Sequence, residues 1–393
     1  MTKLEKLIQE LCPEGVEYKE ISEVTNYEQP SKYIVKSTAY RDEYEIPVLT
    51  AGQSFVLGYT DESDGVYPAS KATPVIIFDD FTAAFKWVVF PFKVKSSAMK
   101  IITAKEDSLL IRFLFHWMGV LNYSSTEHTR LWIGTYSKFR IPVPPQPVQR
   151  EIVRILDNFT ELTAELTAEL TAELTARKQQ YAYYRDKLLT HSSETKICKL
   201  ADVCESIADG DHMPPPKADD GIPFITISNI TEQNKIDFSN TMFVPSSYYD
   251  ALADKRKPHS GDILYTVVGS YGIPVCIEQD TKFVFQRHIA ILRPRSEVIK
   301  ARYMFHAMQS GAFKAQADKA AKGAAQKTIG LSSLAEMTLP VPDMCIQERL
   351  IRVLDRFDTL CTDLNIGLPA EIEARQKQYE YYRDKLLTFT PAD

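Results

Sequence analysis

One segment occurs twice in this chain, and this duplication constrains the fold more than any other feature. Residues 141–190 align without a gap on residues 339–388, and about half of the paired positions are identical. Each copy opens with Pro-Val-Pro, which favours extended chain and cannot lie inside a helix. Apolar residues then recur at helical spacing: Ile152, Ile155, Leu156, Phe159, Leu162 and Leu166, matched by Leu350, Val353, Leu354, Phe357, Leu360 and Leu364. The pattern predicts two long amphipathic helices, and each is the obvious partner for the other's apolar stripe.

The regions between the repeats are each long enough for a globular domain. They contain short runs rich in Val, Ile, Phe and Tyr, typical of strands in small mixed sheets, at residues 46–52, 73–80, 85–94, 222–230, 261–269, 272–279 and 283–294. Helical patterns follow late in each region, at residues 108–119 and 301–317. We therefore predict an α+β fold with two globular mixed α/β domains. The expected order is domain 1–145, helix 146–190, domain 191–342 and helical region 343–390.

Two similar halves usually associate around a pseudo-two-fold axis. Such an axis would run the two long helices antiparallel, as a coiled coil, and place the domains at opposite ends. The internal repeat therefore predicts two domains that are separated by helices.

A shorter repeat lies inside the first helix. Residues 160–176 spell Thr-Ala-Glu-Leu words, and their leucines recur every four residues. Each word adds roughly 6 Å of helix and turns it by about 40° beyond a full turn, so the number of words sets both a distance and a rotation. In the second copy Gly367 and Pro369 interrupt the pattern, which predicts a kink between two helices. The alternative is a solvated spacer helix of no special length.

Composition excludes several classes of protein. No segment approaches the roughly 18 apolar residues of a membrane span, and the first residues lack the features of a signal peptide, so we expect a cytoplasmic protein. The six cysteines are scattered, without a Cys-x-x-Cys pair, and are interpreted as reduced core residues and not as metal ligands or disulfides.

Charge gives no general support for nucleic-acid binding. The chain carries a net charge of −6, and none of the segments 1–140, 141–190, 191–338 and 339–393 has an excess of basic residues. Any DNA-binding surface must therefore come from local clustering. One candidate is the Gly/Ala-rich run at residues 314–330, where Lys322 and Lys327 could contact phosphates and Gln326 could read an adenine edge. The alternative interpretation of this run is a solvated helix end and loop.

The first region offers weaker candidates for DNA contacts. They are polar or basic residues, each of which could equally be an ordinary surface residue: Lys32, Lys36, Gln53, Lys86, Lys100, Ser124, Thr126 and Arg130.

No catalytic motif is present in the sequence. It lacks a phosphate-binding Gly-x-x-x-x-Gly-Lys-Ser/Thr loop, a dinucleotide fingerprint, a His-Glu-x-x-His zinc motif, a nucleophile elbow and the Asn/Asp-Pro-Pro-Tyr tetrapeptide of adenine methyltransferases. An unrecognised nuclease or methyltransferase domain is therefore disfavoured. A coiled-coil scaffold without DNA specificity is kept as the alternative to a DNA-binding protein.

Taken together, these features resemble the DNA-specificity subunit of type I restriction–modification systems, over the whole chain. The resemblance rests on the two Pro-Val-Pro entries into long helices, the Thr-Ala-Glu-Leu words, and the paired ends YAYYRDKLLT and YEYYRDKLLT. It also rests on the runs GDILYTVVGSYG and QKTIGLSSL of the second domain.

The resemblance implies that each domain is a target-recognition domain that reads one half of a split double-stranded DNA site. The helices would separate the halves, and the number of words would set the unread gap. The subunit itself would be non-catalytic and hold no cofactor. Two methylation subunits would use S-adenosylmethionine, and restriction or translocation subunits would use ATP and Mg²⁺.

The resemblance also suggests residues for these roles. In the second domain it implies DNA contacts at Ser270, Tyr271, Arg287, Lys322, Gln326 and Lys327. At the helix ends it makes six residues candidates for partner docking: Tyr181, Tyr184, Arg185, Tyr379, Tyr382 and Arg383. These six could equally form the seam between the two helices.

Overall fold

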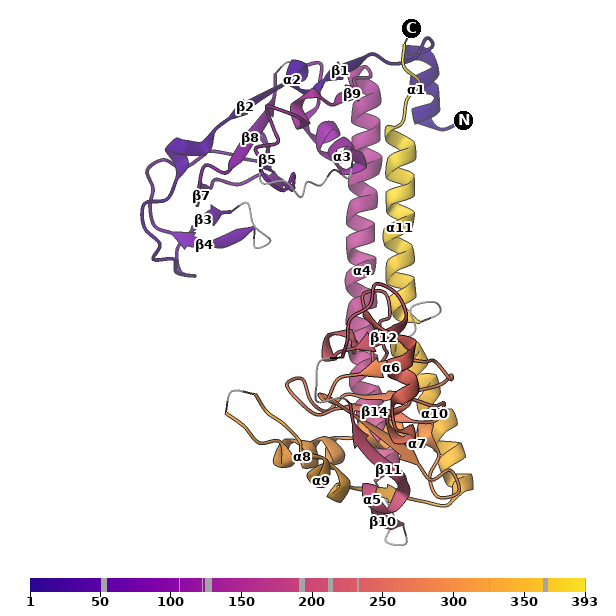
Figure 1. The fold of residues 1–393 in the computed structure, drawn as a ribbon. Helices are drawn as coiled ribbons and strands as arrows, with labels where there is room; N and C mark the ends of the chain where they lie inside the picture. The colour runs from indigo at the N-terminus through magenta and orange to yellow at the C-terminus, as the bar shows by residue number, and fades with distance from the viewer. Residues whose placement is uncertain are drawn as a thin grey trace. The chain divides into compact units, whose positions relative to one another are not determined.

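The computed structural model divides into two compact units, and each is described here by itself (Figure 1). Unit 1 comprises residues 1–168 and 373–393, and unit 2 comprises residues 169–372. The structure describes residues 1–50, 55–105, 107–121, 123, 129–190, 195–210, 215–231, 233–324, 326–362 and 367–392.

Unit 1 combines two small sheets, a strand pair and several helices. Its elements are α1 (Lys3–Leu11), β1 (Tyr18–Glu20), α2 (Ile21–Val24), β2 (Thr25–Glu28), η1 (Pro30–Tyr33), β3 (Ile46–Leu49), β4 (Val56–Thr60), β5 (Val75–Asp79), β6 (Phe85–Val88), β7 (Lys93–Val94), β8 (Met99–Ala104), α3 (Ile111–Leu121), η2 (Tyr136–Lys138) and β9 (Arg140–Pro142). The sheets have the strand orders β2-β8-β5-β6 and β4-β3-β7, and β1 pairs with β9.

Unit 2 repeats this arrangement. Its elements are β10 (Lys196–Lys199), α5 (Leu200–Val203), β11 (Cys204–Asp209), β12 (Ile222–Ile225), η3 (Ile227–Asn229), β13 (Met242–Val244), α6 (Ser246–Ala251), η4 (Asp254–Arg256), β14 (Ile263–Thr266), β15 (Pro274–Cys276), β16 (Val284–Phe285), β17 (Ile289–Pro294), α7 (Ala301–Met308), α8 (Gly311–Ala320), α9 (Leu331–Glu336), β18 (Thr338–Val341) and α10 (Met344–Thr362). The sheets have the orders β11-β17-β14-β15 and β13-β12-β16, and β10 pairs with β18. The internal repeat therefore includes the globular domains, and the predicted α+β class is confirmed.

The central strand of each larger sheet is buried on both faces. In β5, Ile76 and Phe78 pack toward α3, whereas Val75 and Ile77 pack toward the smaller sheet. In β14, Ile263 and Tyr265 likewise join the core that contains α7, and Leu264 joins the core that contains the smaller sheet. This alternation follows from the two-residue period of a strand, and it explains why both runs are continuously apolar in the sequence.

Two long helical segments complete the units. Helix α4 (Gln146–Leu189) is continuous through the Thr-Ala-Glu-Leu words, whereas its repeat is divided into α10 and α11 (Leu368–Leu387), as Gly367 and Pro369 predict. Within unit 1, Thr160 of α4 contacts the hydroxyl of Tyr379 in α11 at 3.0 Å. Within unit 2, the ring of Tyr181 in α4 stacks on Phe357 of α10. Each unit therefore contains a seam between one part of α4 and the repeated helix.

A buried glutamine ties each globular domain to the start of its helix. In unit 2 the side chain of Gln347 accepts from the backbone N–H of Lys300 at 2.8 Å and donates to the carbonyls of Val298 and Pro342, at 3.0 and 2.8 Å. In unit 1 Gln149 makes the same three kinds of bond, to Leu110, Ser108 and Pro144. Both glutamines are fully buried.

A second connection, from a histidine and an arginine to an aspartate, is also duplicated. His306 of α7 lies 2.6 Å from a carboxylate oxygen of Asp355 in α10, and Arg302 lies 2.7 Å from the same oxygen. In unit 1 His116 and Arg112 of α3 each lie 2.8 Å from Asp157 of α4. Burial opposes ionisation of Asp355, but hydrogen bonds from His306 and Arg302 outweigh it and hold its pKa below the usual value.

We predict that Gln347→Ala lowers the free energy of unfolding by about 2–4 kcal/mol. The substitution leaves one N–H and two carbonyl groups without a partner, and each such buried group costs roughly 1–3 kcal/mol. Denaturant unfolding followed by circular dichroism measures the change. The matched control is Gln376→Ala, whose exposed side chain bonds only Glu380; equal losses from the two variants would contradict the proposed role of Gln347.

Candidate nucleic-acid interface

The turn between β14 and β15 places two of the predicted DNA contacts at the surface of unit 2. Gly269 and Gly272 have φ values of +73° and +96°, which non-glycine residues rarely adopt. Between these glycines, Ser270 is exposed and Tyr271 is half-buried. The two glycines therefore explain why the sequence GSYG forms a tight projecting turn.

A second loop lies directly against this turn. Its two sides pair at Lys322 and Thr328, which exchange backbone hydrogen bonds of 2.9 and 2.8 Å. Gly323 has a φ of +122°, and a Cβ there would lie 2.3 Å from the carbonyl oxygen of Gln326. The carbonyl of Lys327 accepts from the N–H of Gly269 at 3.0 Å. The structure thus brings together Gln326, Lys327 and the Ser270 turn, and the side chains of Lys322, Gln326 and Lys327 are all exposed.

Tyr271 is held by a residue that the sequence reasoning missed. Its hydroxyl donates to Asp318 of α8 at 3.0 Å, and this hydrogen bond raises the pKa of Tyr271, which keeps the hydroxyl protonated. Asp318 lies 47 positions away in the sequence. No spacing signal could have identified the pair, because the loop and α8 meet only in the folded unit.

Arg287 lies next to the same turn. It is exposed in the turn that precedes β17 (Ile289–Pro294), and the backbone carbonyl of its neighbour His288 accepts a hydrogen bond from the N–H of Val267 at 2.9 Å. Burial, with a smaller contribution from the charge of Arg287, lowers the pKa of His288. Residues 269–272, residues 287–288 and the described residues 322–324 and 326–327 therefore lie close together, and we call the surface they form the unit 2 loop surface.

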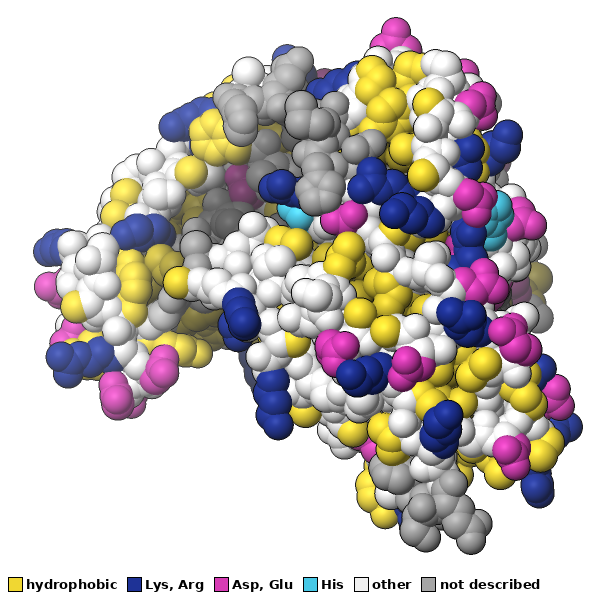
Figure 2. All heavy atoms as spheres, turned by 60° about the horizontal axis from the view of Figure 1, so that its bottom comes forward, with side chains coloured by type: hydrophobic (Ala, Val, Ile, Leu, Met, Phe, Trp, Pro, Cys, Tyr) yellow, Lys and Arg dark blue, Asp and Glu magenta, His cyan; other side chains and the backbone are white. Residues whose placement is uncertain are grey.

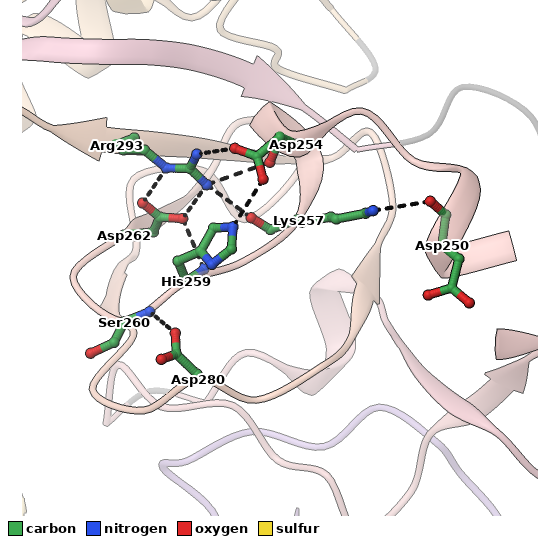
Figure 3. Close-up of polar contacts among 8 residues, drawn as sticks. All are labelled: Asp250, Asp254, Lys257, His259, Ser260, Asp262, Asp280 and Arg293. Carbon is green, nitrogen blue, oxygen red and sulfur yellow. Dashed lines mark hydrogen bonds and ion pairs between the residues drawn. The ribbon is translucent and has the colours of Figure 1, made fainter. Parts of the chain in front are cut away.

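A network of charged side chains holds another part of unit 2 (Figure 3). Arg293 of β17 contacts Asp262 at 3.1 Å and Asp254 at 2.7 Å, and it donates to the carbonyl of Lys257. His259 lies 3.3 Å from Asp254. Two basic residues close to this network are also engaged inside the unit: Arg256 contacts Asp209, and Lys257 donates to the carbonyl of Asp250.

One predicted contact in unit 1 is wrong. Lys100 is fully buried, its ammonium group lies 3.2 Å from Asp80, and it donates to Gln29 at 2.7 Å. A lysine in this position cannot reach a phosphate, because the ion pair and the hydrogen bond hold its charge inside the domain. Lys100 therefore stabilises the interior of unit 1.

The other predicted contacts in unit 1 remain predictions. Lys32, Lys36, Lys86 and Arg130 are exposed, and Lys32 forms an ion pair with Glu28 at 2.7 Å. Gln53, Ser124 and Thr126 lie outside the described residues. The structure does not bring the described four into one cluster through any recorded contact.

The space-filling view shows how charge is distributed over one face. Lysine and arginine side chains are interspersed there with aspartate and glutamate, and they form no continuous basic patch (Figure 2). Among the described residues, no cluster of His, Cys, Asp and Glu could hold a metal ion, and no helix is long and apolar enough to cross a membrane.

The helix-end residues divide between the two roles considered for them. Tyr181 is buried and bonds the ring of His306 at 2.9 Å, so it belongs to the interior of unit 2. Tyr379 lies in the seam through Thr160. Arg185 packs over Tyr181 and Arg383 pairs with Asp384, both half-buried. Tyr184 and Tyr382 are 39% and 41% exposed. Tyr184 also stacks on Phe357 of α10, and Tyr382 packs edge-on against Phe159 of α4, so both rings contribute to a seam and keep only one part exposed for a partner.

Comparison with known proteins identifies a family. The family model described as type I restriction modification DNA specificity domain matches residues 13–176 and again residues 192–374. The type I restriction enzyme EcoR124I/EcoR124II specificity subunit of Escherichia coli is 40% identical over 99% of this chain and 97% of its own length. A putative type I restriction enzyme specificity subunit of Haemophilus influenzae, S.HindORF215P, is 31% identical over 99% of both chains.

A solved structure has the same fold. It comes from a study of complex assembly and conformational transition of the type I R-M system, and it matches 93% of this chain and 97% of its own chain. The TM-score is 0.60 and the sequence identity 15%, so this likeness bears on the fold alone.

We predict that Lys327→Ala weakens binding to all DNA sequences alike. If Lys327 contacts a phosphate, its loss lowers the slope of log affinity against log salt by about one unit. The measurement is DNA affinity at several salt concentrations. Lys282→Ala is the control, because Lys282 is equally basic but packs over Tyr249 away from the loop surface; an unchanged slope in Lys327→Ala excludes the phosphate contact.

Gln326→Ala is expected to have a different effect. A glutamine that reads an adenine edge contributes about 1–3 kcal/mol of discrimination at one base pair, so its loss relaxes one position of the target and leaves the others unchanged. Selection from randomised half-sites measures this. A selected half-site identical to that of the unmodified protein rules out the assignment of Gln326.

Proposed function

Because this chain belongs to the type I restriction–modification DNA specificity family, we propose that each of its units reads one half of a split double-stranded DNA target. The single observation that carries this proposal is the duplication of the whole unit. Each match to the family model covers one globular domain together with a helix, and each domain has its own glutamine and aspartate connections to that helix. A protein with two such units suits a target with two separate parts.

In unit 2 the loop surface is the proposed reading surface. It combines exposed basic side chains for phosphates with hydroxyl and amide groups for base edges, on a backbone fixed by hydrogen bonds between the loops. In unit 1 the proposed contacts are the exposed Lys32, Lys36, Lys86 and Arg130, with Gln53, Ser124 and Thr126, which lie outside the described residues.

We propose that helix α4 sets the gap between the two half-sites. The helix is uninterrupted from Gln146 to Leu189, and the boundary between the units, after residue 168, falls within its repeated words. A continuous helix transmits a length change of roughly 1.5 Å per inserted residue, which a flexible linker would not do.

We propose that partner subunits carry out DNA methylation and ATP hydrolysis. Two methylation subunits would bind S-adenosylmethionine and methylate adenine, and restriction or translocation subunits would hydrolyse ATP with Mg²⁺. The lack of catalytic motifs in the sequence supports a non-catalytic subunit, and the partly exposed rings of Tyr184 and Tyr382 are the contacts proposed for docking partners.

Deletion of residues 167–170, one complete word, is expected to shorten the preferred gap and leave both half-sites unchanged. The physical reason is that the deletion removes roughly 6 Å of helix, equivalent to one or two base-pair steps, without touching either domain. The readout is the methylated motif of the variant. The control is deletion of residues 167–168 alone, which rotates the remaining helix by half a turn and should abolish methylation; a gap that stays the same after loss of the whole word would rule out the ruler.

The function itself is tested by expressing this chain with a methylation subunit encoded beside it and mapping modified adenines across a genome. We expect one split motif with a modified adenine in each half. An unsplit motif would contradict the assignment of one half-site to each unit. A complex that binds its methyl donor but modifies no defined motif would contradict the specificity role altogether.

A further inference from the structure

The two units differ in what covers the first turns of their repeated helices. In unit 1 the N-terminal helix α1 lies against the start of α4: Leu4 of α1 shares a buried core with Val148 and Ile152, and Leu7 and Ile8 pack at its margin. Figure 1 shows α1 beside this end of the helix pair. Val148, within this core, is fully buried.

The same positions in unit 2 are uncovered. The repeat pairs Val148 with Ile346 and Ile155 with Val353, and these two aliphatic side chains of α10 are 42% and 43% exposed. We call the surface made by Ile346, Arg349 and Val353 the open α10 face. The difference is local, because one heptad further along both copies carry an exposed leucine, Leu162 and Leu360.

Chain length explains why unit 2 has no counterpart of α1. In unit 1, residues 1–17 precede β1 and include the nine-residue α1. In unit 2, only residues 190–195 lie between α4 and β10, which is too short for a helix and the connection that would return it to the sheet. Unit 2 therefore has no segment of the length of residues 1–17 before its first strand.

Charge indicates what kind of helix would fit. In unit 1 the Lys3 ammonium of α1 lies 2.8 Å from the carboxylate of Glu151, which also pairs with Arg154. The hydrogen bonds from Arg154 and Lys3 lower the pKa of Glu151 to about 2. The repeat puts Arg349 where Glu151 stands and Arg352 where Arg154 stands, and both are exposed. A helix on the open α10 face must present an acidic residue where α1 presents Lys3.

We propose that the open α10 face binds an acidic amphipathic helix from a partner subunit, at one copy per chain. The proposal rests on the function proposed above, because it requires a complex with other subunits. The covered half of the molecule shows the mode of binding, with aliphatic residues spaced three and four apart packed along the helix. A second copy of this chain fits poorly, because its own α1 carries Lys3 and Lys6 and would meet Arg349 and Arg352.

The thiol of Cys345 lies next to the open α10 face, so its rate of chemical labelling measures whether the face is covered. Cys345 is exposed and precedes Ile346, whereas Cys12, Cys198, Cys204 and Cys361 are buried. The experiment uses the complete complex of this chain with its methylation and restriction subunits, and measures the rate of maleimide labelling at Cys345 by peptide mass spectrometry. We expect labelling in the unmodified complex to be at least tenfold slower than in the complex carrying Ile346→Glu and Val353→Glu. The control Leu162→Glu, an equally polar change outside the face, should label like the unmodified complex.

The charge requirement is tested separately with Arg349→Glu, which keeps the aliphatic residues. Repulsion of an acidic helix should speed labelling of Cys345 about tenfold, whereas Lys282→Glu, the same change of charge elsewhere in unit 2, should not. Equal labelling rates in all these complexes would overturn the proposal. A complex that native mass spectrometry shows to hold two copies of the chain, joined through this face, would overturn it as well. Methylation of the split motif, measured on the same preparations, shows separately whether the proposed function holds.

Discussion

The hydrogen bonds between each helix start and its globular domain are the interaction on which the rest of this structure depends. Pro-Val-Pro ends the last strand of each domain, because proline lacks the N–H that would continue the strand ladder. The carbonyls of Pro144 and Pro342 lie beyond the paired residues and need another donor. The buried amides of Gln149 and Gln347 donate to the carbonyls of Pro144 and Pro342 and, at the same time, bind backbone groups of the domain. Each domain is thereby fixed to the helix segment of its own unit. A loop that reads DNA transmits its position to a spacer only if this connection is stiff, and the His–Asp and Arg–Asp contacts of both units add to that stiffness.

Periodicity and repetition predicted the elements of the fold, but they could not predict which distant side chains meet. The two long helices, the division of the second one near Pro369 and the seven strand runs named above follow from local patterns, and the structure has strands within each of those runs. Helix α1 and several strands, among them β8 and β11, were not predicted. The burial of Lys100 had no local signal, because its partners Asp80 and Gln29 come from different parts of the chain. The contact of Tyr271 with Asp318 was missed for the same reason. Ser270 and Tyr271 were proposed from the resemblance, and Lys322, Gln326 and Lys327 were first proposed from the composition of their run. Only the folded unit shows that the two segments adjoin.

The duplication is imperfect in two ways, and both have physical consequences. Helix α4 is continuous through the repeated words, whereas Gly367 and Pro369 accompany the division of its copy into α10 and α11, so only the first copy is one uninterrupted helix. Helix α1 adds to unit 1 a cover for α4 that unit 2 lacks, which leaves Ile346 and Val353 exposed at equivalent positions. An internally repeated protein thus presents two similar DNA-reading units but two different helix surfaces. Partners that recognise the shared features can bind twice, and a partner that recognises the open α10 face can bind only once.

The net charge of the chain limits how much it can contribute to DNA affinity, as distinct from the choice of DNA sequence. Double-stranded DNA carries one negative charge per roughly 1.7 Å of its axis, and proteins that bind it alone release many counterions through basic side chains. This chain has a net charge of −6, and the predicted contacts of unit 2 include only three basic residues, Arg287, Lys322 and Lys327. Basic residues that could have added to this number, such as Arg256, Arg293 and Lys100, are engaged with carboxylates inside their units. On the function proposed above, most of the attraction to the DNA backbone comes from other subunits of the complex. The role left to this chain is the choice of sequence, which needs few contacts but requires that those few be held rigidly.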